Sequence, residues 1–241
     1  MLSIRHFSKA YAGGKNAKKA VDDLSLEIAA GDIYGFIGHN GAGKTTTLRA
    51  VAGVLDFTEG DIQIDGVSVR KDPVACKKIT AYIPDNPDLY EHLTGMQYLG
   101  FIADLFGVPG PQRAREIERY ADRFEISDRL GELIGAYSHG MKQKLTLCSA
   151  LLHHPKLYLL DEPFVGLDPK ATHTCKEIMA EECAKGCAFF FSTHVLEVAE
   201  RLCNRIAIIK DGRLAASGET QAVKGDGSLE DLFMELIDEH A

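Results

Sequence analysis

The sequence predicts an α/β fold, in which a mixed or parallel sheet carries an N-terminal antiparallel β subdomain and an inserted helical subdomain. Three observations support this class. Residues 157–160, 188–191 and 206–209 are short and almost wholly apolar, which is typical of buried parallel strands. The opening of the chain is rich in strand-forming residues, with partial alternation of apolar and polar side chains. Residues from about 94 to 153 instead carry helix-capping and helix-ending residues.

The N-terminal region is predicted to form antiparallel strands. Residues 2–7 and 21–28 have the composition and partial alternation of strands with one solvated face. Residues 61–69 predict a hairpin, because the Asp-Gly pair at their centre suits the positive φ angles of a tight turn. The apolar run 79–83 predicts one more strand, which a following proline ends.

The middle of the chain changes to helical patterns. Thr94 and Ser138 can each accept a hydrogen bond from a first-turn N–H group, and each can therefore begin a helix. Pro111 suits the first turn of another, strongly charged helix. Pro155 marks the end of the last one, since proline cannot continue a helix. These signals place the helical subdomain at 88–155.

The chain length favours one domain with an inserted lobe. With 241 residues, we expect a single domain over 1–241. Its core and β subdomain occupy 1–87 and 156–225 in this interpretation, and the helical subdomain separates these two parts. Residues 226–241 are expected to form a C-terminal helix.

Composition and charge exclude several function classes. The formal net charge is −8, and no basic run offsets it, which argues against nonspecific nucleic-acid binding. No segment approaches the roughly 20 apolar residues of a membrane span, and the first residues lack a signal-peptide core. The six cysteines form no C-x-x-C pair, so neither a zinc site nor a disulfide framework is expected. We therefore expect a cytosolic chain.

A glycine-rich loop at residues 38–46 matches the phosphate-binding pattern G-x-x-x-x-G-K-[ST]. A predicted strand at 32–37 precedes it and a predicted helix at 46–52 follows, which argues against a chance occurrence. The N–H groups at such a helix start face phosphate oxygens. Lys44 can reach the β- and γ-phosphates, and Thr45 can hold Mg²⁺. The candidate nucleotide-binding residues of the loop are Gly38, His39, Asn40, Gly41, Ala42, Gly43, Lys44, Thr45 and Thr46.

Two further strands are predicted to end in chemistry-bearing residues. The run 157–160 is followed by Asp161, placed to organise Mg²⁺, and by Glu162, placed to polarise the water that attacks the γ-phosphate. A helix cap or a solvated strand end would explain this pair equally well. His194 follows the strand 188–191 and a short Ser-Thr linker. Its imidazole could bind the γ-phosphate or hold the attacking water, although a lone histidine is more often structural.

A second phosphate-binding surface is predicted at Ser138 and Gly140, which lie at the start of the third helix of the insertion. The simpler alternative is a plain capped helix. One triphosphate does not need two such surfaces from one chain, so a second chain could supply the other.

Taken together, these motifs resemble the ATP-binding subunits of ABC transporters, and the resemblance covers nearly the whole chain. The residues that carry it are, in order, Tyr11, the loop at 38–46, Tyr-Ser-His-Gly-Met at 137–141, Asp161-Glu162, Val-Gly-Leu-Asp at 165–168 and His194. The resemblance implies a P-loop NTPase core that binds ATP with Mg²⁺ and hydrolyses ATP, with Glu162, His194 and Lys44 in catalysis. It also implies that Tyr11 stacks on adenine.

The resemblance also implies partners. Ser138 and Gly140 would contact the γ-phosphate held by a second ATP-binding subunit, identical or not, and Asp168 would cross the dimer interface. An integral membrane permease would dock on the helical subdomain, and the chain would be peripheral at the cytoplasmic face of the cell membrane. No nucleic-acid partner is implied. A soluble ATPase of the same family, acting on a non-membrane partner, and a metabolic kinase are the alternatives.

Two departures from the family pattern are informative. The signature usually reads Leu-Ser-Gly-Gly-Gln, whereas residues 137–141 are Tyr-Ser-His-Gly-Met, which resembles the bacterial exporter-type branch. The stretch 228–233 near the C-terminus resembles the same branch. Asp85 replaces the glutamine that usually touches Mg²⁺ or water, so Asp85 is a candidate metal ligand, with a solvent-facing turn residue as the alternative.

Overall fold

A six-stranded mixed sheet forms the centre of the computed structural model, which describes residues 1–11, 19–57 and 59–238. Its strands are β3 (Ile33–Ile37), β6 (Thr80–Ile83), β7 (Leu157–Asp161), β8 (Ala188–Thr193), β9 (Arg205–Lys210) and β10 (Arg213–Glu219). The strand order is β10-β9-β3-β8-β7-β6, and all neighbours are parallel except β9 and β10. The predicted α/β class with a mixed sheet is confirmed.

The N-terminal part of the chain forms a second, antiparallel sheet. Its strands are β1 (Leu2–Ala10), β2 (Lys19–Ile28), β4 (Glu59–Ile64) and β5 (Val67–Ser68). They lie in the order β2-β1-β4-β5. The predicted hairpin at 61–69 is the β4–β5 pair, with its turn at Asp65 and Gly66, and both of these residues adopt positive φ angles.

Helices separate β6 from β7 in sequence and form a lobe of their own. They are α3 (Gly95–Leu105), α4 (Gly110–Arg123) and α5 (His139–Leu151), with two short 3₁₀ turns at Ser127–Arg129 and Ile134–Ala136. Thr94 caps α3, and Gln97 completes the capping box. Ser138 caps α5 by accepting from the Met141 N–H group. The subdomain limits 1–87, 88–155, 156–225 and 226–241 stay a prediction.

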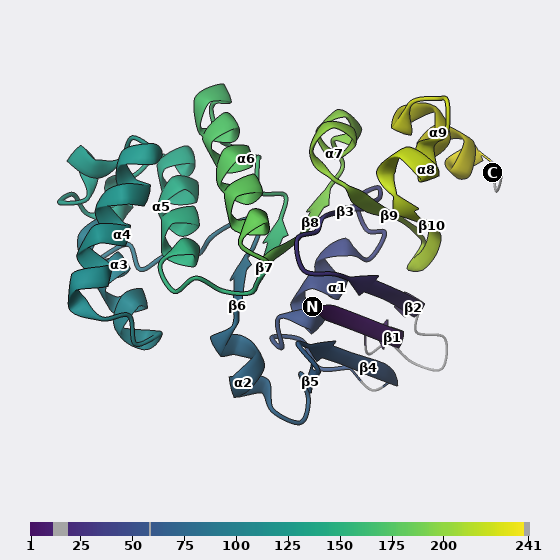
Figure 1. Ribbon diagram of the computed structural model, residues 1–241, viewed down its shortest axis with the longest axis horizontal. Helices are drawn as coiled ribbons and strands as arrows, with labels where there is room; N and C mark the ends of the chain where they lie inside the picture. Colours follow the sequence, from purple (N-terminus) through teal and green to yellow (C-terminus); the bar gives the residue numbers. More distant parts are fainter. Residues whose placement is uncertain (12–18, 58, 239–241) are drawn as a thin grey trace.

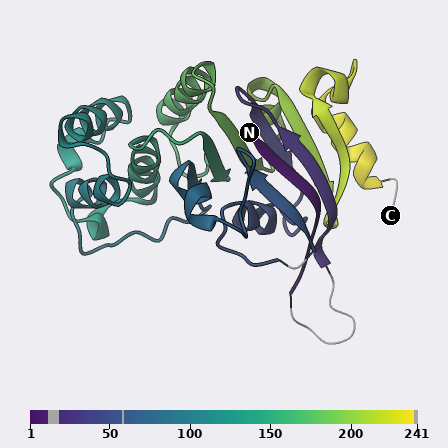
Figure 2. The ribbon, with the colours of Figure 1, turned by 60° about the horizontal axis from the view of Figure 1, so that its bottom comes forward.

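The remaining helices lie around the six-stranded sheet. They are α1 (Lys44–Val51), α2 (Pro73–Lys78), α6 (Pro169–Ala184), α7 (Leu196–Leu202), α8 (Thr220–Lys224) and α9 (Leu229–Asp238). Helix α1 contacts β2, β7 and β8, whereas α6 contacts β8 and β3, and α7 contacts β3. Figure 1 shows α3, α4 and α5 at one end of the molecule, with α8 and α9 at the other. Figure 2 shows the helical lobe extending to one side of the two sheets.

Strands β7 and β8 are buried on both faces because each supplies alternate residues to two separate cores. Tyr158 and Leu160 pack with the helical lobe and α6, and Tyr158 stacks on Phe189 with ring centroids 4.2 Å apart. Leu157 and Leu159 pack with the N-terminal sheet and α1. Both faces are therefore apolar, which explains the continuous apolar runs in the sequence.

The structure adds elements that the sequence patterns did not predict, and it corrects one. Strand β10 and helices α2, α6, α7 and α8 were not predicted. The Ser-Thr pair at 192–193 was expected to be a linker, but it is the buried end of β8. Among the described residues, none of the helices is long and apolar enough to cross a membrane.

Candidate nucleotide-binding site

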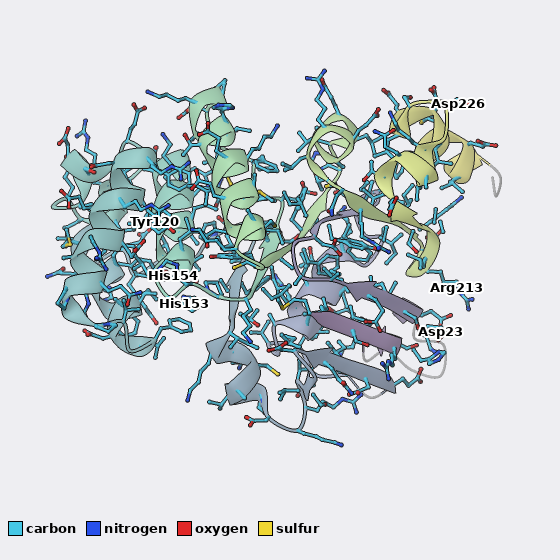
Figure 3. The ribbon with its side chains drawn as sticks, viewed as in Figure 1. Asp23, Tyr120, His153, His154, Arg213 and Asp226 are labelled. Carbon is cyan, nitrogen blue, oxygen red and sulfur yellow. The ribbon has the colours of Figure 1, made fainter. Side chains whose placement is uncertain are left out.

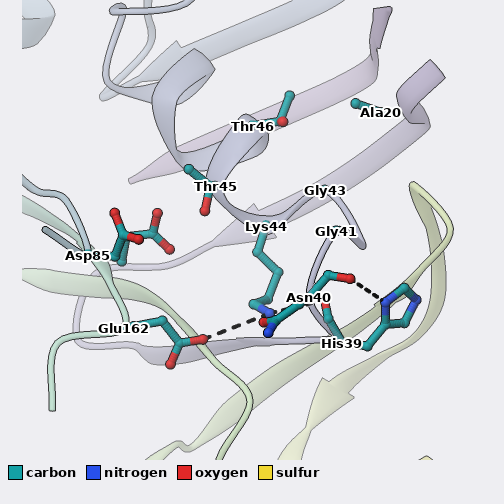
Figure 4. A pocket seen from close by; sticks show the side chains of 11 residues that line it. Ala20, His39, Asn40, Gly41, Gly43, Lys44, Thr45, Thr46, Asp85 and Glu162 are labelled. Atoms are coloured by element: carbon teal, nitrogen blue, oxygen red, sulfur yellow. Dashed lines mark hydrogen bonds and ion pairs between the residues drawn. The ribbon is translucent and has the colours of Figure 1, made fainter. Parts of the chain in front are cut away.

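A cavity of about 200 Å³ lies where the parallel strands end, at the edge at which ligands bind in such sheets. Loops from β3, β6 and β7 reach it together. It is lined by Ala20, His39, Asn40, Gly41, Gly43, Lys44, Thr45, Thr46, Asp85, Asp161 and Glu162. Figure 4 shows Lys44 between the glycine-rich loop and Glu162, with Thr45 and Asp85 on one side of it.

The N-terminus of α1 offers backbone N–H groups to an anion. Its N-cap, Gly43, adopts a left-handed conformation with φ 111°, and an added Cβ would lie 2.5 Å from the Ala20 carbonyl oxygen. Only glycine fits this position. No side chain of the described residues caps α1, and its first turn carries no acidic residue. The first N–H groups are thus left for a ligand, and the helix dipole favours a negative one.

Lys44 places a buried positive charge in this cavity. Its side chain is 7% exposed, and the ammonium donates to the carbonyl oxygens of Gly38 at 2.5 Å and His39 at 3.3 Å. The Nζ atom lies 3.9 Å from Glu162 Oε1. Burial lowers the pKa of Lys44, whereas the charges of Glu162 and Asp161 oppose this shift. A phosphate would supply the anion that a buried ammonium needs.

Asp161 holds an unpaired carboxylate oxygen opposite the loop. The residue is 1% exposed, and its Oδ1 accepts from the Ser192 hydroxyl at 2.5 Å. Within the described part of the chain, Oδ2 is buried and has no hydrogen-bond partner. A buried, unpaired carboxylate oxygen is costly unless a ligand completes it. Asp85, which is exposed, lines the same cavity.

Glu162, which lines the cavity, pairs with His194, which does not line it. Glu162 has a positive φ of 50°, an uncommon conformation for a residue with a side chain, and its N–H group donates to Ser192 Oγ at 3.1 Å. His194 Nδ1 lies 2.9 Å from Glu162 Oε1. The His194 side chain is about half exposed, so its other ring nitrogen is accessible to a ligand.

The structure does not bring every predicted site residue to this cavity. Tyr11 lies beside the loop, with its hydroxyl 3.2 Å from the Thr46 hydroxyl. Ala42, a residue of the loop itself, is fully buried. Ser138 and Gly140 lie at the start of α5 and do not line the cavity.

Sequence reasoning missed two residues of this site. Ala20 lines the cavity only because β2 passes beside the loop, and an alanine carries no chemical signal of its own. Ser192 holds both Asp161 and the Glu162 backbone. Ser192 directly follows the apolar run 188–191, and this position at the end of a parallel strand could have indicated a site residue.

A glycine-rich loop facing strand-end carboxylates, in a mixed sheet with a helical insertion, defines the class of ATP-binding cassettes. The comparisons agree: residues 21–165 match the family model described as ABC transporter. The ABC-type transporter ATP-binding protein EcsA of Bacillus subtilis (strain 168) is 35% identical over 246 residues, covering 100% of this chain and 98% of EcsA. The chain belongs to the ABC transporter family, as an ATP-binding cassette that hydrolyses ATP.

Solved structures give the same fold. A structure described as the ATP-binding subunit of an ABC transporter superposes with a TM-score of 0.93 and 34% identity, covering 99% of this chain and 100% of that one. The cassette MJ0796, solved as a dimer bound to ADP and Pi, has a TM-score of 0.83 and 22% identity over 91% of this chain and 99% of that one. At that identity, the likeness to MJ0796 supports the fold alone.

Proposed function

We propose that this chain is the ATP-hydrolysing subunit that powers substrate export through a separate membrane subunit. The observation that supports it most is the cavity at the sheet edge, where Lys44 and the free N–H groups of α1 face Asp161 and Glu162. The exporter direction comes from the resemblance of residues 137–141 and 228–233 to that branch of the family. In this proposal the chain is peripheral at the cytoplasmic face of the cell membrane and binds no nucleic acid.

The donor set fits Mg²⁺ together with a triphosphate. Thr45 supplies a hydroxyl, and Asp161 supplies the unpaired Oδ2. Among the described residues, no three His, Cys, Asp or Glu side chains form a metal-binding cluster. This fits Mg²⁺, which usually takes one or two carboxylates and completes its shell with phosphate oxygens and water. When bound, the ion offsets phosphate charge. Asp85 is close enough to the cavity to act through a bridging water.

The catalytic roles follow from the same geometry. Glu162 would accept a proton from the attacking water, since it faces the cavity and is held by its backbone bond to Ser192. With both ring nitrogens protonated, His194 would donate from Nδ1 to the Glu162 carboxylate and from Nε2 to the γ-phosphate. Lys44 would leave its carbonyl partners to hold the β- and γ-phosphates.

The second half of the site would come from another cassette. Ser138 and Gly140 lie outside the cavity of their own chain, at an α5 N-terminus that can face an anion. In a head-to-tail dimer, this surface would close over the ATP held by the partner's loop. Tyr11, which is about half exposed beside the loop, would stack on adenine, and Asp168 would lie at the interface. MJ0796, whose fold this chain shares, was solved as a dimer.

A groove beside β6 would receive the membrane subunit. It has a volume of about 200 Å³ and lies between the β6 segment and helices α3 and α5. Exposed apolar side chains, Tyr90, Phe101 and Leu105, lie next to it on and before α3. An apolar groove of this kind suits a short amphipathic helix. Asp85 follows β6 by two residues and lines the nucleotide cavity. A docked helix that moves this segment would therefore also move a residue of the cavity.

The Glu162→Gln variant tests this proposal. It keeps the side-chain shape but removes the basic carboxylate, so the ATPase rate should fall by at least about 10²-fold. ATP should then trap a dimer, which light scattering detects with the membrane subunit present or at high protein concentration. The matched control is Lys44→Ala, which should neither hydrolyse ATP nor dimerise with it. Normal hydrolysis by Glu162→Gln, or no ATP-dependent dimer, would contradict the mechanism.

A further inference from the structure

The first two turns of α5 hold both ends of the loop at 163–168. Gln143 is fully buried and donates from Nε2 to the Pro163 carbonyl oxygen at 3.3 Å. Lys144 Nζ lies 2.8 Å from Asp168 Oδ2, and the Lys144 hydrogen bond lowers the pKa of Asp168. The loop therefore starts and ends on contacts with the same helix.

The middle of this loop is held by His139. A Cβ added to Gly166 would lie 2.4 Å from the Cδ2 atom of the His139 ring, so the ring packs directly against the glycine. A Cβ added to Gly140 would lie 2.7 Å from the Gly166 carbonyl oxygen. His139 and Gln143 are four residues apart and so lie on one face of the helix.

The loop connects two parts of the site. It begins directly after Glu162, whose positive φ and bond to Ser192 fix the start of the loop. The same end of α5 presents Ser138 and Gly140. The contact between α5 and the loop thus connects Glu162, in the cavity of this chain, to the Ser138 surface, which is proposed to close the cavity of the partner cassette.

We propose that His139 is a positioning residue for ATP hydrolysis. Its ring against Gly166 fixes the loop 163–168 relative to the start of α5, so that Glu162 and the Ser138 surface move as one unit. The inference rests on the proposed function, because it needs both surfaces to act on ATP. It also gives a role to the histidine that stands where the family signature usually has glycine.

A double-mutant cycle on the intact chain tests the contact. Gly166→Ala adds a methyl group against the His139 ring, and His139→Ala removes that ring. We expect Gly166→Ala alone to lower kcat by about tenfold or more. In the His139→Ala background, its cost should be at least roughly fivefold smaller, because residues in contact are coupled. The Kd for ATP should change less than about twofold, since the contact lies outside the cavity.

Gly66→Ala is the matched control for backbone strain. Gly66 and Gly166 have the same φ of +80°, but a Cβ at Gly66 would meet no atom within 4 Å. Gly66→Ala should leave kcat unchanged. Equal costs of Gly166→Ala in both backgrounds would overturn the inference, as would a lower melting temperature without a change in kcat. A wild-type chain no more active than Lys44→Ala would instead overturn the proposed function, and the inference with it.

Discussion

The nucleotide cavity and the groove beside β6 have the same volume, about 200 Å³, but they are built in different ways. Backbone N–H groups, a buried lysine and carboxylates form the cavity. The groove is formed mainly by apolar side chains from β6, α3 and α5, including Tyr98, Ile102 and Phe106. The first is suited to a charged ligand of fixed shape, and the second to a helix that buries apolar surface.

His153 adds an imidazole ring to the lining of the groove, whose other polar residues include Thr80, Asp88, Thr146 and Ser149. Figure 3 shows His153 at the end of α5, near β6. Its ring stacks on Phe106 with centroids 3.7 Å apart, and burial lowers the pKa of His153 to about 4. Within the described ranges, its ring nitrogens and the Thr80 hydroxyl are buried without a hydrogen bond of normal geometry. The groove thus keeps His153 neutral near pH 7, whereas the cavity brings Lys44 and several carboxylates together.

The largest expected effect comes from removing the cavity's positive charge. Lys44→Ala should abolish ATP hydrolysis and weaken ATP binding by about 1.5–3 kcal/mol, the range for hydrogen bonds to charged groups. The groove should be untouched, so binding of the membrane subunit without nucleotide should be retained. Calorimetric titration with ATP and a phosphate-release assay measure the first two effects.

An exposed lysine provides the control for that variant. Lys156, which pairs with Asp65 on the surface, can be replaced by alanine. Lys156→Ala should leave ATP binding and hydrolysis unchanged. Unchanged hydrolysis in Lys44→Ala would show that the cavity is not the ATPase site.

Burial of His153 in the groove should make the free energy of unfolding depend on pH. The pKa of His153 falls from an ordinary 6.5 to about 4 on folding, so the unfolded chain takes up a proton first as the pH drops. The part of the unfolding free energy that depends on His153 should be fully present above about pH 6.5 and should decline as the pH falls toward 4. Between pH 7 and pH 5, this residue should cost roughly 2 kcal/mol of unfolding free energy. His153→Phe keeps a ring against Phe106 and should remove that part of the decline, as urea unfolding measures.

Ile102→Val controls for a change in groove packing alone. Ile102 lines the same groove and does not titrate. The variant should lose about 0.5–1.5 kcal/mol by similar amounts at both pH values. If wild type and His153→Phe lose the same stability between pH 7 and pH 5, the imidazole is not protected by the groove.

The smallest effect is expected at Asp85, which links the two regions. It lines the cavity with Thr45 and Asp161, but it is exposed and follows β6. Asp85→Gln should keep ATP binding and raise the Mg²⁺ concentration for half-maximal hydrolysis by roughly two- to fivefold, the effect of one exposed carboxylate. ATPase rates measured across a Mg²⁺ titration decide this. Superimposable curves would mean that Asp85 is only a turn residue.

These two regions also differ in how far the sequence predicted them. The glycine-rich loop, Asp161 and Glu162 were found because each is a local signal: a fixed glycine-lysine spacing, or carboxylates directly after an apolar run. Their assembly followed from the rule that parallel strands end at one edge. The groove combines residues from three separated segments, so no short pattern marks it. His153 could not be distinguished from a surface histidine before its packing on Phe106 was known.

In the fold as well, elements marked by a local sequence pattern were predicted, whereas elements that depend on tertiary contacts were not. Strands with buried faces and helices with clear caps were predicted, including the start of α3 at Thr94. Helix α6 was not predicted, because its sequence shows only a weak amphipathic pattern. Its N-cap, Asp168, was interpreted instead as a residue of the dimer interface. Strand β10 alternates half-buried and exposed residues and contains two alanines and a glycine, which are poor strand formers. Tertiary contacts with β9, rather than local preference, decide its conformation.

The shared strands β7 and β8 have a consequence for motion. Because each strand belongs to two cores at once, its backbone cannot separate from one core without disrupting the other. Segments of this kind open only in the rare events that unfold the whole domain, whereas loops and surface helices open far more often. Asp161 is the last residue of β7. Its carboxylate is therefore a fixed reference point on the millisecond scale of lid and domain movements, against which the loops around it rearrange.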